Sequence, residues 1–186
     1  MNYRALRVVL KMLSHLPCAY SEWRDALGES LRRVEEALRR GEGIVAAFLL
    51  RFSLEVISQM RFLAWRSERE GVSIHELLGR YSKMGRAFTL KMVRSVPGLP
   101  GVYRKQLART YLKLAHLTHP SKAALELAAS RSSSLEEELL ADALDFIALL
   151  ALHHVPLGSL DRLNPEELSS VGLTRSSKYL AKKLRG

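Results

Sequence analysis

The sequence predicts an all-α protein, folded as one bundle of five to seven substantial helices. Apolar residues recur with helical spacing along nearly the whole chain, no segment shows the alternation of a strand, and no repeat of fixed period appears. The length of 186 residues suits one domain, and 47% hydrophobic with 26% charged residues is typical of a globular protein. We therefore expect a single domain over residues 1–186, with residues 156–186 as a small C-terminal appendage.

The first three helices are separated by Pro17 and Gly41. The first carries one apolar stripe, formed by Leu6, Val9, Leu10, Leu13 and Leu16. The second is expected over residues 21–40, and its inward residues are Trp23, Leu27, Leu31, Val34 and Leu38. The third, over residues 44–70, is apolar on most sides, which predicts the central buried helix.

Turn and capping residues delimit the later helices. Gly71 ends the long helix, and Ser73 with Glu76 forms a capping-box pattern before a helix that is expected to reach about Arg94. The segment VPGLPG at residues 96–101 must interrupt helix. The remaining helices are expected over residues 102–118, 120–128 and 135–153, after an Asn164 cap, and in the basic C-terminal segment.

Two polar features are expected to be structural. Arg51 and Glu55 are spaced i,i+4 on the most apolar helix, which predicts a buried or half-buried ion pair. His153 and His154 follow an apolar helix. Because the negative end of a helix dipole favours an imidazolium, we expect these histidines to cap that helix.

The composition excludes several kinds of protein. The single cysteine, Cys18, allows neither an internal disulfide nor a thiolate zinc site, and no metal-ligand spacing appears, so we expect no metal and no cofactor. Arg51, Glu55 and Arg61 interrupt the most apolar stretch, so we expect no membrane partner. No signal-peptide pattern appears, which favours a cytoplasmic location. Four side-chain amides in all, and 20 arginines among 29 basic residues, favour a thermophilic source.

The net charge of +10 is concentrated in one basic segment, residues 77–125, which contains ten basic residues and no Asp or Glu. The rest of the chain holds 29 − 10 = 19 basic and 19 acidic residues and sums to zero. Such a segment attracts the phosphates of nucleic acids or nucleotides, and the alternatives are an acidic protein partner or a merely solvated face. Its basic residues are Arg80, Lys83, Arg86, Lys91, Arg94, Arg104, Lys105, Arg109, Lys113 and Lys122.

The stretch RTYLKLAHLTHPS, residues 109–121, is the most distinctive chemically. On a helical wheel, Lys105, Arg109, Lys113 and His116 fall within about 80° of each other, opposite an apolar face. Arginine offers a charged fork that matches phosphate oxygens, and histidine can transfer a proton near neutral pH. Metal-free RNA cleavage needs these two functions and the 2′-hydroxyl of the substrate. Catalysis, phosphate contact alone and no specific role are all open at this point.

The same stretch resembles the HEPN superfamily in two ways. RTYLKLAH matches the Arg-x4-6-His signature through Arg109 and His116. YLKLAHLTHPS is similar to the Tyr-x-x-Leu-[Ser/Ala]-x-x-x-His-Pro-Ser phrase of HEPN-like outliers, whose characteristic histidine is here His119. LLRFSLE, with Arg51 and Glu55, resembles the Leu-Arg-x-x-x-Glu of a central helix in such outliers. The resemblance spans about residues 44–130.

This resemblance implies an up-and-down helical core, commonly dimeric, that acts as a metal-independent endoribonuclease or a nucleotide-binding module in toxin–antitoxin and defence systems. Arg109 would stabilise the phosphorane, and His116 or His119 would act as acid or base. If His119 is the equivalent residue, the arginine function is displaced or lost. We expect RNA or another nucleic acid as partner, and a homodimer and an antitoxin-like or assembly partner are consistent with the family. The alternative is a non-catalytic nucleic-acid-binding or assembly subunit.

Overall fold

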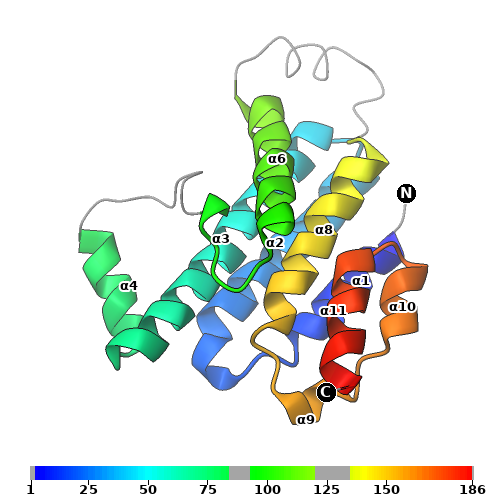
Figure 1. The fold of residues 1–186 in the computed structure, drawn as a ribbon. Coiled ribbons are helices and arrows are strands. Elements are labelled where there is room, and N and C mark those ends of the chain that lie inside the picture. Colours follow the sequence, from blue (N-terminus) through cyan, green and yellow to red (C-terminus); the bar gives the residue numbers. More distant parts are fainter. Residues whose placement is uncertain (1–2, 84–92, 120–134, 186) are drawn as a thin grey trace.

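A computed structural model describes residues 3–83, 93–119 and 135–185, and within these ranges the protein is an all-α bundle without strands (Figure 1). Seven of the described helices have ten or more residues, which confirms the predicted fold class. The helices are α1 (Tyr3–Leu13), α2 (Ser21–Arg39), α3 (Gly43–Glu70), α4 (Ile74–Lys83), α6 (Gly101–Thr118), α8 (Glu137–Leu152), α9 (Leu157–Leu160), α10 (Pro165–Ser170) and α11 (Thr174–Arg185). The helix expected over residues 120–128 lies outside the described residues.

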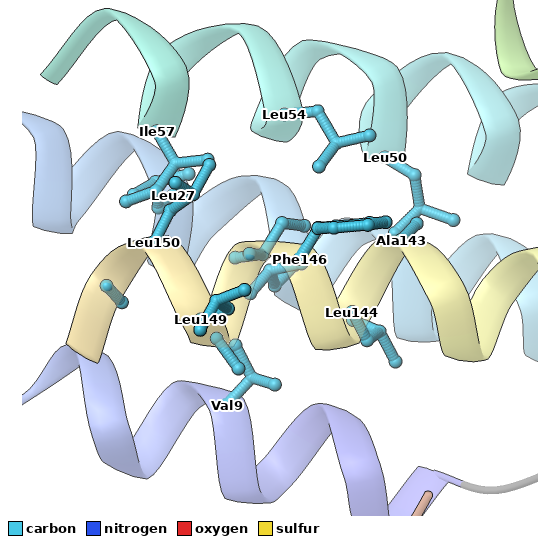
Figure 2. Close-up of a cluster of buried hydrophobic side chains, with 14 of the residues drawn as sticks. Val9, Leu27, Leu50, Leu54, Ile57, Ala143, Leu144, Phe146, Leu149 and Leu150 are labelled. Atoms are coloured by element: carbon cyan, nitrogen blue, oxygen red, sulfur yellow. The ribbon is translucent and has the colours of Figure 1, made fainter. Parts of the chain in front are cut away.

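Helix α8 lies at the centre of the bundle and packs against α1, α3, α6 and α11. Its sequence is apolar on nearly every side, and its side chains from Ala143 to Leu152 are all buried. Figure 2 shows Phe146 on the side of α8 that faces α3, whereas Leu149 points toward Val9 of α1. Each fully buried side chain of this kind stabilises the fold by about 1.5–3 kcal/mol. Helix α8 therefore stabilises the packing of α3 on one of its sides and of α1 on the other.

Helix α3 is the long helix that the sequence predicts, and it packs against α2, α4, α6 and α8. It is buried on one side only, since Phe48 and Phe52 are exposed, so the central buried helix is α8, whereas the sequence predicts α3. Its inward face includes Leu50, Leu54 and Ile57, none of which is exposed. By length and composition alone α3 could also cross a membrane, and core helices of globular proteins pass the same test. Half of its most apolar stretch is buried within the described bundle, as expected of a core helix.

The predicted caps form at the helix ends. Gly71 has a φ of 65°, the left-handed conformation that commonly ends a helix, and it follows α3 directly. The Ser73 hydroxyl accepts a hydrogen bond of 3.2 Å from the Glu76 amide, whereas the Glu76 carboxylate accepts one from Arg80. The Asn164 side chain accepts a bond of 2.8 Å from the Glu166 amide and begins α10.

Helix α11 belongs to the same hydrophobic core as the rest of the described bundle. Leu173 and Leu180 are fully buried in that core, and α11 packs against α8 and α10. The Asp145 carboxylate of α8, 0% exposed, accepts hydrogen bonds from the Arg175 amide (2.9 Å) and the Ser176 amide (3.0 Å). It thus caps the first turn of α11 from another helix, and the expected C-terminal appendage shares the core of the domain.

His153 occupies the C-cap position of α8, as predicted, but the expected positive charge is wrong, because both histidines are neutral at neutral pH. Burial, with the charges of Arg61 and Lys183, lowers the pKa of His153 to about 4. Burial, with Arg61 and His153, lowers the pKa of His154 to about 3. His154 packs instead on the ring of Tyr20, with 4.9 Å between the ring centroids.

Candidate nucleic-acid interface on helix α6

Two prolines set the limits of α6. Pro100 precedes its first residue, and Pro120 follows His119 in the sequence. Because a proline disfavours helical backbone in the residue before it, His119 leaves the helix with φ −94° and ψ 153°. The end of the helix therefore places His119 at the edge of the bundle, where it is exposed.

Helix α6 has the two faces that the helical wheel predicts. Its buried face packs against α3 and α8 and comprises Leu107, Ala108, Thr110, Tyr111, Leu114 and Ala115. Arg109, Lys113 and His116 are exposed. The burial of Ala108 and Thr110 makes the inward face broader than the apolar pattern alone indicates, and the exposed strip correspondingly narrower.

Four predicted basic residues meet at a groove of about 410 Å³ beside the first turns of α6. We call this the α6 groove, and its lining residues are Arg94, Gly101, Arg104, Lys105, Ala108, Arg109 and Leu112. All four cations are exposed, and none of them forms an ion pair with another described residue. Among the described residues that line the groove none is acidic, so no carboxylate of this set offsets their positive charge.

The other predicted nucleic-acid-binding residues lie elsewhere. Lys113 is exposed on α6, beyond the groove. Arg80 lies on α4, far from α6 in Figure 1, and its guanidinium contacts Glu76 (2.6 Å) and Glu70 (3.9 Å). Arg86, Lys91 and Lys122 lie outside the described residues, as does the side chain of Lys83.

A second polar cluster joins α3 to the end of α6, and we call it the α3–α6 cluster: Arg51, Glu55, Tyr111, Thr118 and His119. Arg51 Nε donates to Glu55 Oε1 at 3.2 Å, which is the i,i+4 pair of the sequence, with side chains 22% and 26% exposed. Arg51 Nη1 donates to Thr118 Oγ1 at 2.9 Å and lies 3.5 Å from His119 Nε2. The Tyr111 hydroxyl donates to Glu55 Oε1 at 2.7 Å.

Burial and hydrogen bonds shift the pKa values of two members of this cluster, Tyr111 and Arg51. Burial raises the pKa of Tyr111, and its hydrogen bond to Glu55 raises it further. Burial, the largest single influence, lowers the pKa of the Arg51 guanidinium, but the hydrogen bond to Glu55 and the interactions with Tyr111 and the Glu55 charge together raise it. Arg51 is therefore always charged, and it can only donate.

The cluster includes partners that the sequence alone did not connect. The structure places Arg51 of α3 beside His119, whereas the sequence pairs Arg109 with His116 or His119. The Tyr111 hydroxyl donates to Glu55, a contact that residue spacing did not indicate. One signal pointed this way: Leu-Arg-x-x-x-Glu and His-Pro-Ser belong to the same HEPN-like resemblance, so their residues could be expected to meet.

The remaining observations name no cofactor or relative. Among the described residues, no group of three or more His, Cys, Asp or Glu side chains could hold a metal ion. No protein-family model, curated protein or solved structure matches the chain. The HEPN resemblance therefore stays a prediction.

Proposed function

We propose that this protein binds RNA through the exposed cationic face of α6. The observation that carries this proposal is the α6 groove, where Arg94, Arg104, Lys105 and Arg109 gather without a carboxylate among the lining residues. Several arginines on other helices are paired with carboxylates, for example Arg33 with Glu29 on α2. A guanidinium without a carboxylate partner keeps its donor fork for phosphate oxygens.

The length of the face also suits a nucleic-acid strand. From Gly101 to His116 a helix rises about 22 Å, at about 1.5 Å per residue. A strand in a double helix advances about 3.4 Å per nucleotide, so this face could meet about six nucleotides. Lys113 extends the cationic line beyond the groove, in register with Arg109 one turn earlier.

The salt dependence of RNA binding tests the proposal. The variant Arg94→Ala/Arg104→Ala/Arg109→Ala removes three groove cations. Because each single-strand phosphate contact contributes about 0.7 to the slope of log K against log salt, the slope should fall in magnitude by about 2. Fluorescence anisotropy of a short labelled RNA over a salt series measures it, and a DNA strand of the same sequence shows whether the 2′-hydroxyl contributes.

A charge-matched variant separates the groove from net charge. Arg32→Ala/Arg33→Ala/Arg40→Ala also removes three arginines, all of them exposed and all on or just after α2. It should bind RNA with the wild-type slope. An equal loss in both variants would mean that net charge alone governs binding. No binding even at low salt would reject an RNA interface and favour an acidic protein partner.

The α3–α6 cluster supports a second candidate function, metal-independent RNA cleavage. In such a reaction the 2′-oxygen attacks the adjacent phosphorus and the bond to the 5′-oxygen breaks, which leaves a 2′,3′-cyclic phosphate and a 5′-hydroxyl. A base takes the proton of the 2′-hydroxyl, and an acid protonates the leaving oxygen. The exposed His119 could perform one transfer, and the neighbouring Arg51 could stabilise the phosphorane. Arg109 is too far from His119 in the sequence for the Arg-x4-6-His signature, and Arg51 would then take the role of the arginine in that signature.

Cleavage assays in EDTA distinguish the two alignments of the HEPN resemblance. His119→Ala should slow cleavage by about 10²-fold or more, the usual contribution of a general acid or base. Arg51→Lys keeps the charge but loses the donor fork, so it should also be slow. His116→Ala, on the same helix, should cleave normally. The opposite result for the two histidines would transfer the role to His116, and activity unchanged in every variant would indicate a contaminating nuclease.

A further inference from the structure

A second cavity lies on the other side of the start of α6, and none of the functions above uses it. Its volume is about 520 Å³, within the usual range for small-molecule sites. We call it the α11 pocket, and its walls come from the turn at residues 98–100, Tyr103 of α6, the end of α8 and one face of α11. Figure 1 shows α11 beside the C-terminal half of α8, so the pocket joins segments far apart in the sequence.

One side of the α11 pocket is cationic. Arg175 lies at this wall but is already held by Asp142 (2.9 Å) and Asp145 (3.1 Å), so its role is structural. Lys178, Lys182 and Lys183 also line the pocket, are exposed, and form no ion pair with a described residue. None of the described residues that line the pocket is acidic. Three ammonium groups therefore face one cavity, and the described part of its walls supplies no counter-charge.

The other side of the pocket is apolar and aromatic. Leu99 and Leu149 are buried there, and Tyr103 and Tyr179 are half-buried. The Tyr179 ring lies 4.4 Å from the ring of His153, centroid to centroid, and its hydroxyl is 3.2 Å from His153 Nδ1. These contacts hold the ring of Tyr179 in place, so this part of the aromatic wall is formed before any ligand enters.

The backbone adds to the positive character of the pocket. Gly98 has a φ of 82°, and a Cβ at this position would lie 2.9 Å from Arg61 Nη2, so the turn requires glycine. Arg61 Nε donates to the Pro97 carbonyl at 3.1 Å and so fixes the turn. Helix α6 begins three residues after Gly98, and the first amides of a helix have no partner within it and carry partial positive charge. The neutral state of His153, which the charges of Arg61 and Lys183 favour, agrees with this positive field.

We propose that the α11 pocket binds a nucleotide, with the phosphates on Lys178, Lys182 and Lys183 and the base against Tyr103 and Leu149. The cationic side of the pocket matches the phosphates of a nucleotide, and the aromatic side matches its base. A phosphate alone or a base alone would occupy only one of these two sides. A free nucleotide and the phosphorylated 5′ end of a nucleic-acid strand both present a base next to a phosphate, so either could be the ligand. The proposal does not depend on RNA binding in the α6 groove, because the two sites share no lining residue.

Calorimetric titration of the full chain in EDTA tests this site with three probes: ATP, adenosine and tripolyphosphate. ATP should bind at least about tenfold more tightly than either fragment, since only ATP engages both sides. Equal affinity for tripolyphosphate and ATP would overturn the proposal, because the aromatic wall would then contribute nothing. Absence of ATP binding at millimolar concentration would overturn it as well. A 5′-phosphorylated oligonucleotide compared with ATP identifies the source of the ligand.

Variants locate the binding. Lys178→Ala/Lys182→Ala/Lys183→Ala changes only exposed side chains and should weaken ATP binding by roughly tenfold, as three exposed charge contacts would. Tyr103→Leu should weaken ATP by roughly fivefold, the scale of one base–aromatic contact, and leave tripolyphosphate unaffected. Two control variants should bind ATP normally: the α2 variant, which lacks Arg32, Arg33 and Arg40, and the groove variant, which lacks Arg94, Arg104 and Arg109. An equal loss in the α2 variant would reduce the effect to net charge, and a loss confined to the groove variant would assign ATP to the α6 groove instead.

Discussion

At the scale of single residues, Asp145 does most to place the C-terminal helix. Its carboxylate is inaccessible to solvent and accepts from two backbone amides, the Ser176 hydroxyl (2.7 Å) and Arg175 Nη1 (3.1 Å). A buried carboxylate is tolerated only when its charge is matched and its oxygens are bonded, and here both conditions hold. The same contact sets the position of α11, and with it the lysines of the α11 pocket.

Asp145→Ala should therefore destabilise the protein by about 3–5 kcal/mol, the usual loss when one partner of a buried ion pair is removed. Asp145→Asn keeps the shape and one acceptor oxygen, so its loss should be smaller. Asp142→Ala removes the more exposed partner of Arg175 and should have the smallest effect, about 1 kcal/mol or less. Urea unfolding gives the three free energies. Equal losses for Asp142→Ala and Asp145→Ala would show that burial of the carboxylate is not what matters.

At the scale of elements, local sequence was enough for most of the helices. The apolar periodicity placed α2, α3 and α6 within about two residues of their ends, because each buries a face against neighbours and stops just before a proline or glycine. Helix α1 was located but ends at Leu13, before Leu16, the last residue of its predicted stripe. Local signals of the Ser73 and Asn164 type also predicted caps that form. The histidines after α8 were assigned wrongly, since a dipole argument considers only the helix itself and their burial depends on Tyr20 and α11.

The candidate site was less predictable, because charge and contact depend on tertiary neighbours. Residues 77–125 contain no acid, yet Arg80 is neutralised by Glu76, one residue before that segment, and by Glu70 of α3. Similarly, the helical wheel of α6 considers one helix alone and could not show that Arg51 of α3 donates to Thr118. Which cations are left without a carboxylate is a property of the packed helices and cannot be read from the linear order of charges.

At the scale of the whole molecule, the first turn of α6 lies between two cationic surfaces, the α6 groove and the α11 pocket. Gly101 and Arg104 line the α6 groove, and Pro100 and Tyr103 line the α11 pocket. At physiological salt, charges more than about 8 Å apart are largely screened when exposed. Binding at one surface should thus affect the other mainly through the position of this helix start. The turn that fixes it also lies against Arg61 and His153, which connects the pocket to the stability of the fold.

The two buried histidines after α8, His153 and His154, predict how the free energy of unfolding depends on pH. The pKa values of His153 and His154 in the folded state are about 4 and about 3, below the unfolded value near 6.5, so the unfolded chain binds more protons as the pH falls below 6.5. The free energy of unfolding should fall by about 2 kcal/mol from pH 7 to about pH 5.5, where carboxylates scarcely titrate. His154→Leu should remove about half of this fall, because it removes one of the two histidines with a lowered pKa. The substitution breaks no hydrogen bond of Nε2, which has no partner among the described residues. Urea unfolding at both pH values measures it, with the exposed His75→Leu as control, and an undiminished fall in His154→Leu would contradict a neutral, buried His154.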